Sequence, residues 1–447
     1  MKILIVAFWF PPSNFIGAIR VGKLARHLDG RGYDVRVLTT DIAEDRSVPL
    51  EIPRERVICA EYRQARDRLG PWVRRFRRCG VRGSTGNQDG AAVAAGGRAA
   101  QEQDGPARWS LWELLRNQYY GLRHIPDRRR NWVNTAVPAG MRLIGEWKPD
   151  LMFASAPPFT GLIVASRLSR AGKIPWIADF RDLWVDNPYY SEPGWRRPID
   201  TLLEWQTVRD AAALVTVSPI WAEQLRRRHG KPTEVVYNGY AAEDFPSAPP
   251  RDERGGALTI RHTGTIYRGF RDPSAVFAAI ALLPEFLRDR VRVEFFGDAG
   301  DDVVAMAAKH RVGDRVAVRP RVPYRHALEL QMQADVLLLL QWVDKRDEGN
   351  LPGKLFEYLY ARRPILFIGY EQGIAAQIIR ERGAGLVSSA PEQIRSQLQQ
   401  WIEAKDAGRL TTLGPSVTHG LSREDQFRKL ESLFAAVVNG QRVATGS

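Results

Sequence analysis

The sequence contains little cysteine and no long apolar run. Of its 447 residues only two are cysteines, Cys59 and Cys79, and neither has metal-ligand spacing around it. A disulfide scaffold or a zinc site is therefore not indicated, and a reducing cytoplasm fits this composition. The first apolar run, residues 3–10, stops at Pro11-Pro12 and lacks the length and cleavage site of a signal peptide. No run approaches the roughly 18 residues of a transmembrane helix, so we expect a cytoplasmic protein, soluble or peripheral on the inner face of the cell membrane.

Signatures of several nucleotide- and nucleic-acid-binding proteins are also missing. Without a G-x-G-x-x-G pattern, a dinucleotide-dependent oxidoreductase loses its main support. No RRM, KH or helix-turn-helix signature is found, which argues against a specific nucleic-acid partner. The net charge of +14 nevertheless calls for an anionic partner, which leaves nucleic acid, an anionic membrane surface or a phosphorylated substrate.

Positive charge is concentrated in two blocks that also contain aromatic residues. Residues 62–78 carry seven arginines against one acid, together with Trp72 and Phe76. A second basic-aromatic block spans residues 109–132. Segments at a membrane interface combine arginine with tryptophan and tyrosine in this way. The blocks therefore predict contact with an anionic membrane, and a solvated basic surface is the alternative.

Length and composition predict two packed domains. The chain is too long for a single compact core, and 44% of its residues are hydrophobic. Apolar strands alternate with amphipathic helices, as expected for parallel sheets. The expected strands are residues 2–7, 34–39, 151–155, 175–179, 214–217 and 234–237 in the first half and 258–262, 291–296, 316–318, 336–340 and 364–368 in the second.

Composition also marks the domain boundaries. Residues 80–106 are rich in Gly, Ala, Gln and Ser and predict a disordered insertion. Residues 246–256 are rich in Pro and Gly and predict an interdomain linker. We therefore expect an α/β protein with two Rossmann-like parallel-sheet domains, residues 1–245 and 257–415, that face each other across a cleft. Ligands of such sheets bind beyond the carboxyl ends of the strands.

The most informative stretch of the chain is residues 350–359, which follow an expected buried strand and open an expected helix. Gly353 permits a tight turn, and Pro352 suits the start of a helix. Free amides at such a start bind phosphate or another anion. Lys354 adds a positive charge, and Glu357 lies one turn further along the same face. Since a carboxylate there can accept two hydrogen bonds from a diol such as ribose, the stretch outlines a nucleotide-sugar site; an ordinary capped surface helix is the alternative.

This stretch resembles the donor-binding motif of the glycosyltransferase 4 family, whose members have the GT-B fold. It is most similar to the bacterial cell-surface polysaccharide branch, where a Lys-x-x-Glu-Tyr pattern occurs. The resemblance implies that Glu357 holds the nucleotide ribose. It also implies that residues 257–415 bind the nucleotide sugar and that residues 1–245 bind the acceptor. The last segment, residues 416–447, carries a helix that is expected to return to the N-terminal domain.

The first half of the chain has segments similar to the same family. Phe10-Pro11-Pro12 and Gly17 precede an expected helix with Arg20, and this arrangement resembles the acceptor-side loop. Residues 155–159, which begin with Ser155, also resemble the polysaccharide branch. Gly17, Arg20 and Ser155 are therefore expected on the acceptor side.

Residues 179–184 end the next expected strand and resemble that branch as well. Asp179 and Asp182 are candidates to orient or deprotonate an acceptor hydroxyl. An ion pair with an arginine such as Arg181 is the structural alternative, because many carboxylates at strand ends are local caps.

A second phosphate-binding element is expected after the first strand of the second domain. Residues 264–269, Gly-Thr-Ile-Tyr-Arg-Gly, match a glycine-rich loop that in the family carries a basic residue on the donor diphosphate. Gly264 and Arg268 occupy that loop, and the fixed charge and planar fork of arginine suit phosphate oxygens. Arg268 and Lys354 are therefore expected to stabilise the departing diphosphate.

The chain departs from the family pattern at one position. A second glutamate is common in an E-x7-E arrangement, with seven residues between it and the ribose-binding one, and here that position is Gly349. Contacts to the sugar are instead expected from Glu348 or from the backbone amides of Asn350 and Leu351. No D-x-D triad occurs, so no metal site is expected, and the diphosphate charge must be neutralised by basic side chains and helix amides.

The resemblance implies an enzyme, a glycosyltransferase of the hexosyltransferase type. It would move a sugar from a nucleotide diphosphate sugar, most simply a UDP-sugar, to a sugar or lipid-linked acceptor in cell-surface polysaccharide synthesis. Retention of configuration and independence of metal are implied, with the nucleotide sugar as co-substrate and no separate cofactor. Two alternatives stay open, a non-hydrolysing UDP-sugar 2-epimerase of the same fold and a basic nucleic-acid-binding protein.

Overall fold

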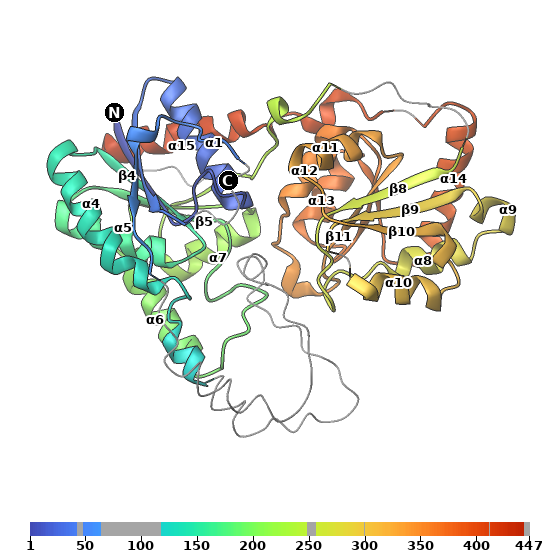
Figure 1. Cartoon of the computed structure of the whole chain (residues 1–447), viewed down its shortest axis with the longest axis horizontal. Helices are drawn as coiled ribbons and strands as arrows, with labels where there is room; N and C mark the ends of the chain where they lie inside the picture. Colours follow the sequence, from blue (N-terminus) through green and yellow to red (C-terminus); the bar gives the residue numbers. More distant parts are fainter. Residues whose placement is uncertain (43–47, 64–117, 248–255, 299, 411, 442–447) are drawn as a thin grey trace. The chain divides into compact units, whose positions relative to one another are not determined.

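The protein divides into two compact units, which are described separately (Figure 1). Unit 1 comprises Met1–Val217, Ala222–Val235 and Leu430–Ser447, and unit 2 comprises Ser218–Trp221 and Val236–Lys429. The computed structural model describes residues 1–42, 48–63, 118–247, 256–298, 300–410 and 412–441. The predicted insertion at 80–106, most of the predicted linker at 246–256 and most of the first basic block lie outside the described residues.

Unit 1 is built on a parallel sheet of seven strands in the order β3-β2-β1-β4-β5-β6-β7. The strands are β1 (Lys2–Ala7), β2 (Asp34–Thr40), β3 (Val57–Ala60), β4 (Leu151–Ala156), β5 (Trp176–Phe180), β6 (Ala213–Thr216) and β7 (Thr233–Val235). Strand order reverses between β1 and β4, where Ala7 pairs with Ser155. In an open parallel sheet this reversal is the topological switch point, where ligands bind.

The helices of unit 1 cover both faces of its sheet (Figure 1). They are α1 (Ile16–Gly30), α4 (Val133–Trp147), α5 (Thr160–Gly172), α6 (Arg196–Val208) and α7 (Pro219–His229), which belongs to unit 1 from Ala222 onward. The last helix, α15 (Arg423–Val438), begins in unit 2, and its residues from Leu430 onward belong to unit 1. There Phe434 packs against Phe153 with 5.5 Å between ring centroids, and Glu431 contacts the His27 ring nitrogen at 2.5 Å.

Unit 2 has a six-stranded parallel sheet in the order β10-β9-β8-β11-β12-β13. Its strands are β8 (Leu258–Thr263), β9 (Val291–Phe296), β10 (Val316–Arg319), β11 (Val336–Leu340), β12 (Ile365–Ile368) and β13 (Gly385–Val387). Its helices are α8 (Ser274–Ala281), α9 (Glu285–Arg288), α10 (Gly300–Lys309), α11 (Tyr324–Gln333), α12 (Gly353–Ala361), α13 (Ile374–Glu381) and α14 (Pro391–Asp406). Here strand order reverses between β8 and β11.

Successive side chains of the central strand β11 point to opposite faces of the sheet and belong to two hydrophobic layers of unit 2. Leu338 and Leu340 pack with residues of α8, α10 and α14 on one face of the sheet. Leu337 and Leu339 pack with residues of α12 and α13 on the other face. A strand buried on both faces has no polar position, which explains the uninterrupted apolar sequence of β11.

The predicted fold class is confirmed, because both sheets are parallel and Rossmann-like. Strand β11 and the strands β1 and β9 have the predicted bounds, and most others differ by one or two residues. Two strands were not predicted, the short edge strands β3 and β13. Along the described part of the chain, every helix is too short or too polar to cross a bilayer.

Candidate active site

The switch point of unit 2 brings Gly264 and Lys354 together. Gly264 follows β8, and α12, which carries Lys354, follows β11 after the loop 341–352. A β-carbon built on Gly264 would lie only 1.9 Å from Lys354 Nζ. Gly264 also has a φ of 124°, a conformation that favours glycine. The loop after β8 therefore leaves room for the lysine ammonium because it lacks a side chain at residue 264.

Lys354 is held among other positive charges. Burial, together with the charges of Arg271 and Arg321, lowers the pKa of Lys354 from its ordinary 10.5 to about 8, while Glu357 opposes the shift. Burial and like charge both disfavour the ammonium ion, which a bound anion would stabilise. A lysine with a strongly shifted pKa at a switch point is typical of a functional site.

The predicted partner of Lys354, Arg268, occupies a more exposed position. Its side chain is 69% exposed and lies 3.5 Å from Asp302. Arg271, three residues further along the same loop, is the arginine whose charge acts on Lys354. Its guanidinium donates a hydrogen bond to the Thr265 carbonyl oxygen at 2.8 Å and stacks 4.4 Å from the centre of the Tyr267 ring. The family pattern alone did not identify Arg271.

Glu357 is oriented by two side chains of α11. Tyr324 Oη donates to Glu357 Oε1 at 3.2 Å, and Gln331 Nε2 donates to Oε2 at 3.1 Å. The same Gln331 amide donates to Thr263 Oγ1 at 3.0 Å, which ties the carboxylate to the end of β8. Burial raises the pKa of Tyr324, and the Glu357 charge adds to this rise, so the phenol stays a hydrogen-bond donor. Each carboxylate oxygen retains capacity for a further hydrogen bond.

The loop before α12 is organised by a buried acid that sequence reasoning missed. Asp347 accepts hydrogen bonds from Asn350 Nδ2 at 3.0 Å and from Gln341 Nε2 at 3.3 Å. The backbone amide of Asn350 donates to the Asp347 carbonyl oxygen, so of the two predicted sugar-binding amides only that of Leu351 makes no hydrogen bond within the described residues. The Leu351 side chain is buried, and Glu348 stays partly exposed.

The switch point of unit 1 gathers the predicted acceptor-side residues. Asp179, at the end of β5, is buried and accepts a hydrogen bond from Ser155 Oγ at 2.7 Å. Arg20 Nη1 of α1 lies 3.5 Å from the other carboxylate oxygen of Asp179. A β-carbon on Gly17 would lie 2.2 Å from the guanidinium of Arg181. Side chains from α1, β4 and β5 thus form one cluster, in which Asp179 has an ionic partner.

Arg181 and Asp182 complete this cluster. Arg181 Nε donates to Ser155 Oγ at 3.2 Å and Arg181 Nη2 to the Pro157 carbonyl oxygen at 2.9 Å. Burial raises the pKa of Asp182, the nearby Asp179 raises it further, and Arg181 opposes the rise. Asp182 has no hydrogen bond or ion pair to the described residues, so of the two predicted carboxylates it is better suited to accept a proton.

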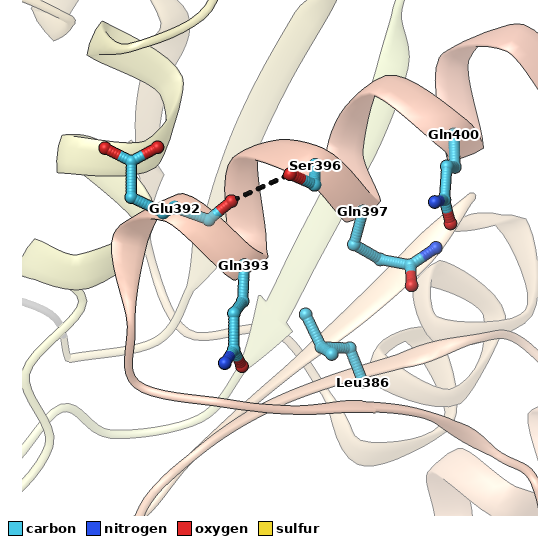
Figure 2. Close-up of a pocket in the computed structure, with 6 residues that line it drawn as sticks. All are labelled: Leu386, Glu392, Gln393, Ser396, Gln397 and Gln400. Carbon is cyan, nitrogen blue, oxygen red and sulfur yellow. Dashed lines mark hydrogen bonds between the residues drawn. The ribbon is translucent and has the colours of Figure 1, made fainter.

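A shallow depression of about 400 Å³ on unit 2 is separate from these residues. Figure 2 shows that it lies along α14, with Leu386 beside Gln393 and Gln397. Its one charged lining residue is the acid Glu392. A depression without a positive charge is poorly suited to a nucleotide diphosphate.

Two doubly wound domains, each with charged side chains at its switch point, define a protein of the GT-B fold class. Sucrose-phosphate synthase from Thermosynechococcus elongatus has a similar structure, with a TM-score of 0.63 and 15% identity over 99% of this chain and 100% of that chain. Anabaena HepE in complex with UDP has a TM-score of 0.62 and 12% identity over 98% and 100%. A UDP-N-acetylglucosamine 2-epimerase has a TM-score of 0.50 and 13% identity over 100% and 98%.

Residues 17–241, half of the chain, match the family model of the glycosyl transferase 4-like domain. The chain therefore belongs to this family, and the expected glycosyltransferase class is confirmed at this level. Among curated proteins, none matches the chain.

Proposed function

We propose that the protein transfers a sugar from a UDP-sugar to a sugar or lipid-linked acceptor in cell-surface polysaccharide synthesis. The observation that carries the proposal is the pairing of Lys354 and Glu357 on α12 beside Gly264. Anabaena HepE, which shares the fold, has been solved with UDP and with UDP-glucose. The proposed sugar is a hexose, as in the UDP-glucose of the Anabaena HepE complex.

In this proposal the donor is held entirely by unit 2. Lys354 and Arg271 neutralise the diphosphate as the glycosidic bond breaks, and Arg268 reaches it from its exposed position. Backbone amides at the start of α12 also donate hydrogen bonds to the diphosphate in this proposal. Glu357 accepts hydrogen bonds from the ribose diol while Tyr324 and Gln331 hold its carboxylate in place. Positive groups that are fixed before the reaction stabilise developing charge without reorganisation.

On the acceptor side, we propose that Asp182 receives the proton of the attacking hydroxyl. Asp179 is engaged by Ser155 and Arg20, so its role is to position this cluster. A carboxylate whose pKa is raised toward neutrality is a better base. Retention of configuration at the transferred sugar is part of the proposal, and NMR of the product linkage tests it.

The proposal includes no metal and no cofactor besides the nucleotide sugar. Lys354, Arg271 and the helix amides supply the charge that a divalent ion supplies in other transferases. Transfer should therefore persist after treatment with EDTA. Loss of transfer with EDTA and recovery with Mg²⁺ would contradict this part of the proposal.

The donor is best tested with a panel of UDP-, GDP- and dTDP-sugars. Each is added to the protein, and the melting temperature is measured; UDP-sugars should raise it most. The epimerase alternative is tested with the same donor in the absence of acceptor. Proton NMR would then show an epimeric sugar nucleotide, whereas a transferase leaves the donor unchanged.

We also propose that the acceptor is presented at an anionic membrane, and helix α6 supports this. This helix buries three of its four charged residues and exposes three apolar ones, the reverse of a usual surface helix. Arg196, Asp200 and Glu204 are at most 2% exposed. Three apolar side chains of the opposite face are 42–56% exposed, namely Ile199, Leu202 and Trp205. Exposed large apolar patches mark interaction sites.

The three buried charged side chains of α6 have partners within unit 1, and these contacts explain why their face of the helix is buried. Arg196 pairs with Asp200 at 2.9 Å, and Glu204 accepts from the Val185 amide at 3.0 Å and contacts His229 at 2.8 Å. Basic residues flank the apolar face, including Arg197 and Arg209. Apolar side chains beside arginines suit the headgroup region of an acidic bilayer.

A further inference from the structure

Arg129 is surrounded by aromatic rings near the carboxyl end of β1 in the unit 1 sheet. Its guanidinium carbon lies 5.5 Å from the ring centre of Phe8, 5.2 Å from that of Trp9 and 5.4 Å from that of Tyr62. The rings also contact each other, since Phe8 meets Trp9 and Tyr62 edge-on. Tyr62 Oη donates to the Arg128 carbonyl oxygen at 2.9 Å and so fixes the backbone beside Arg129. The three rings hold the cation in one place.

The side-chain hydrogen-bond donors of Arg129 have no partner among the described residues. Within the described part of the chain its guanidinium has no ion pair and no hydrogen bond, and the side chain is partly exposed. Arg196 shows how unusual this is, because it donates to Asp200 and to the carbonyl oxygens of Gly121 and His124. Aromatic rings can contact the flat face of a guanidinium, but they cannot satisfy the N–H groups at its edge.

Asp127, whose carboxylate is influenced by the Arg129 charge, is already hydrogen-bonded at the start of a helix. Asp127 accepts hydrogen bonds from the Thr160 amide at 2.9 Å and from the Thr160 hydroxyl at 2.7 Å, at the beginning of α5. It also accepts from the backbone amide of Arg129 at 2.7 Å. The Arg129 charge lowers the pKa of Asp127, whereas burial, the larger influence, raises it. Asp127 therefore fixes the backbone of Arg129 but does not pair with its side chain.

This aromatic cage, formed by Phe8, Trp9 and Tyr62 around Arg129, lies at the switch point of unit 1. Phe8 and Trp9 directly follow β1, whose Ala7 pairs with Ser155 of β4. Ser155 in turn donates to Asp179 in the acceptor-side cluster. Asp127 connects the cage to α5, which follows β4. The unpaired guanidinium and the acceptor-side cluster thus occupy adjacent strand ends of one sheet.

We propose that Arg129 in this cage is an anion-binding site for an oxyanion of the acceptor, either a phosphate or a carboxylate. The planar guanidinium would bind two oxygens side by side, and the rings would contact the group that carries them. Only the assignment of the anion to the acceptor rests on the proposed function. The anion site itself depends on the geometry of the cage.

The test measures the binding of two small anions to the full chain. Inorganic pyrophosphate is titrated by phosphorus NMR, and glucuronate by saturation-transfer proton NMR, in a Lys354→Met background that weakens the donor site. Arg129→Gln should weaken the binding of at least one anion ten-fold or more. Preference for pyrophosphate indicates a phosphate on the acceptor, and preference for glucuronate indicates an acidic sugar.

Arg130→Gln is the matched control, because Arg130 is exposed and adjacent in the same segment. It should change the affinity less than two-fold, and Arg129→Lys, which keeps the charge without the fork, should give an intermediate loss. Near-UV circular dichroism checks that the cage is retained in each variant. Absence of binding of both anions, or equal losses in Arg129→Gln and Arg130→Gln, would overturn the site. If these titrations succeed while UDP-sugars fail to bind, the anion site stands and the transferase proposal fails.

Discussion

Lys354 Nζ occupies space that a β-carbon at residue 264 would fill, since the two points are 1.9 Å apart. The glycine after β8 and the lysine of α12 are therefore one structural feature, although 90 positions separate them in the sequence. The positive charge can lie against the backbone of the loop only while residue 264 lacks a side chain. This relationship leads to the first prediction.

Gly264→Ala should displace the Lys354 ammonium and weaken UDP binding about ten-fold. The end of a lysine side chain can move, so the variant should fold. A non-glycine residue at a φ of 124° is strained, and such strain costs on the order of 1–3 kcal/mol. Calorimetry with UDP and a thermal melt measure the two effects. Gly313→Ala is the control, because nothing lies within 4 Å of its β-carbon and its φ is ordinary; equal UDP affinity in both variants would contradict the prediction.

The affinity for UDP should fall as the pH rises through about 8. The pKa of Lys354 in the folded protein is about 8, so the ammonium that attracts the diphosphate is lost above that value. A bound diphosphate favours the charged form, so binding above pH 8 should take up protons. Calorimetry in two buffers with different ionisation enthalpies detects this uptake. Lys354→Arg, which stays charged, should flatten the pH profile, and an unchanged fall in that variant would exclude Lys354 as its cause.

The same pKa shift predicts that the charged Lys354 lowers the free energy of unfolding. A lysine in an ion pair, whose pKa is raised, would increase it. Between about pH 8 and 10.5 the unfolded chain binds more protons at Lys354 than the folded protein does. The contribution of Lys354 to the free energy of unfolding therefore rises with pH in this window and is unfavourable below it. Lys354→Met should accordingly raise the melting temperature at pH 7 while it weakens UDP binding. A lower melting temperature would show that the lysine stabilises the fold.

The sequence predicts the fold well where strands are buried on both faces. Strand β11, Val336–Leu340, is an uninterrupted apolar run and has the predicted bounds. The unpredicted strands are short and lie at sheet edges. Strand β13, Gly385–Val387, has three residues and starts with glycine, and β3, Val57–Ala60, has four residues. Three or four residues are too few to show the alternation of apolar and polar side chains by which a strand is recognised.

The candidate site is predictable where the motif is local and not where side chains meet through the fold. Lys354 and Glu357 lie one turn apart on α12, so their spacing shows that they share a face. Tyr324 and Gln331 reach Glu357 from another helix, which no sequence spacing reveals. By sequence alone, Arg129 belongs to the second basic-aromatic block, residues 109–132, which predicts contact with an anionic membrane. Its aromatic neighbours Phe8 and Trp9 follow β1, and Tyr62 follows β3, so only the structure shows the cage.

Glu357→Gln should weaken UDP binding by roughly one to two decades. A hydrogen bond to a charged partner is worth about 1.5–3 kcal/mol. Gln331 can still donate to the side-chain oxygen, so the melting temperature should change little. Glu329→Gln on α11 is the control, because Glu329 is partly exposed and pairs with His326 at the surface. UDP affinity that is equal in wild type and Glu357→Gln, measured by calorimetry, would remove Glu357 from the ribose site.

The last prediction concerns the exposed apolar face of α6. If this face contacts an anionic membrane, the double variant Leu202→Gln, Trp205→Gln should reduce binding to acidic liposomes at least ten-fold. Burial of a large apolar side chain is worth about 1.5–3 kcal/mol when complete, and partial insertion of two residues is sufficient for this loss. Flotation with phosphatidylglycerol vesicles measures the bound fraction, and added salt should lower it because the flanking arginines contribute about 1 kcal/mol each.

Phe286→Gln is the control for exposed apolar surface in general. Phe286 is 71% exposed on α9 of unit 2, so its loss should leave liposome binding unchanged. A further variant replaces Arg74, Arg75, Arg77 and Arg78 with Gln and tests the first basic block, most of which lies outside the described residues. Loss of binding in that variant alone would assign the membrane contact to the block and not to α6. Equal flotation with neutral and anionic vesicles, or none with either, would contradict the membrane proposal, and the donor site would be unaffected because Lys354 and Glu357 belong to unit 2.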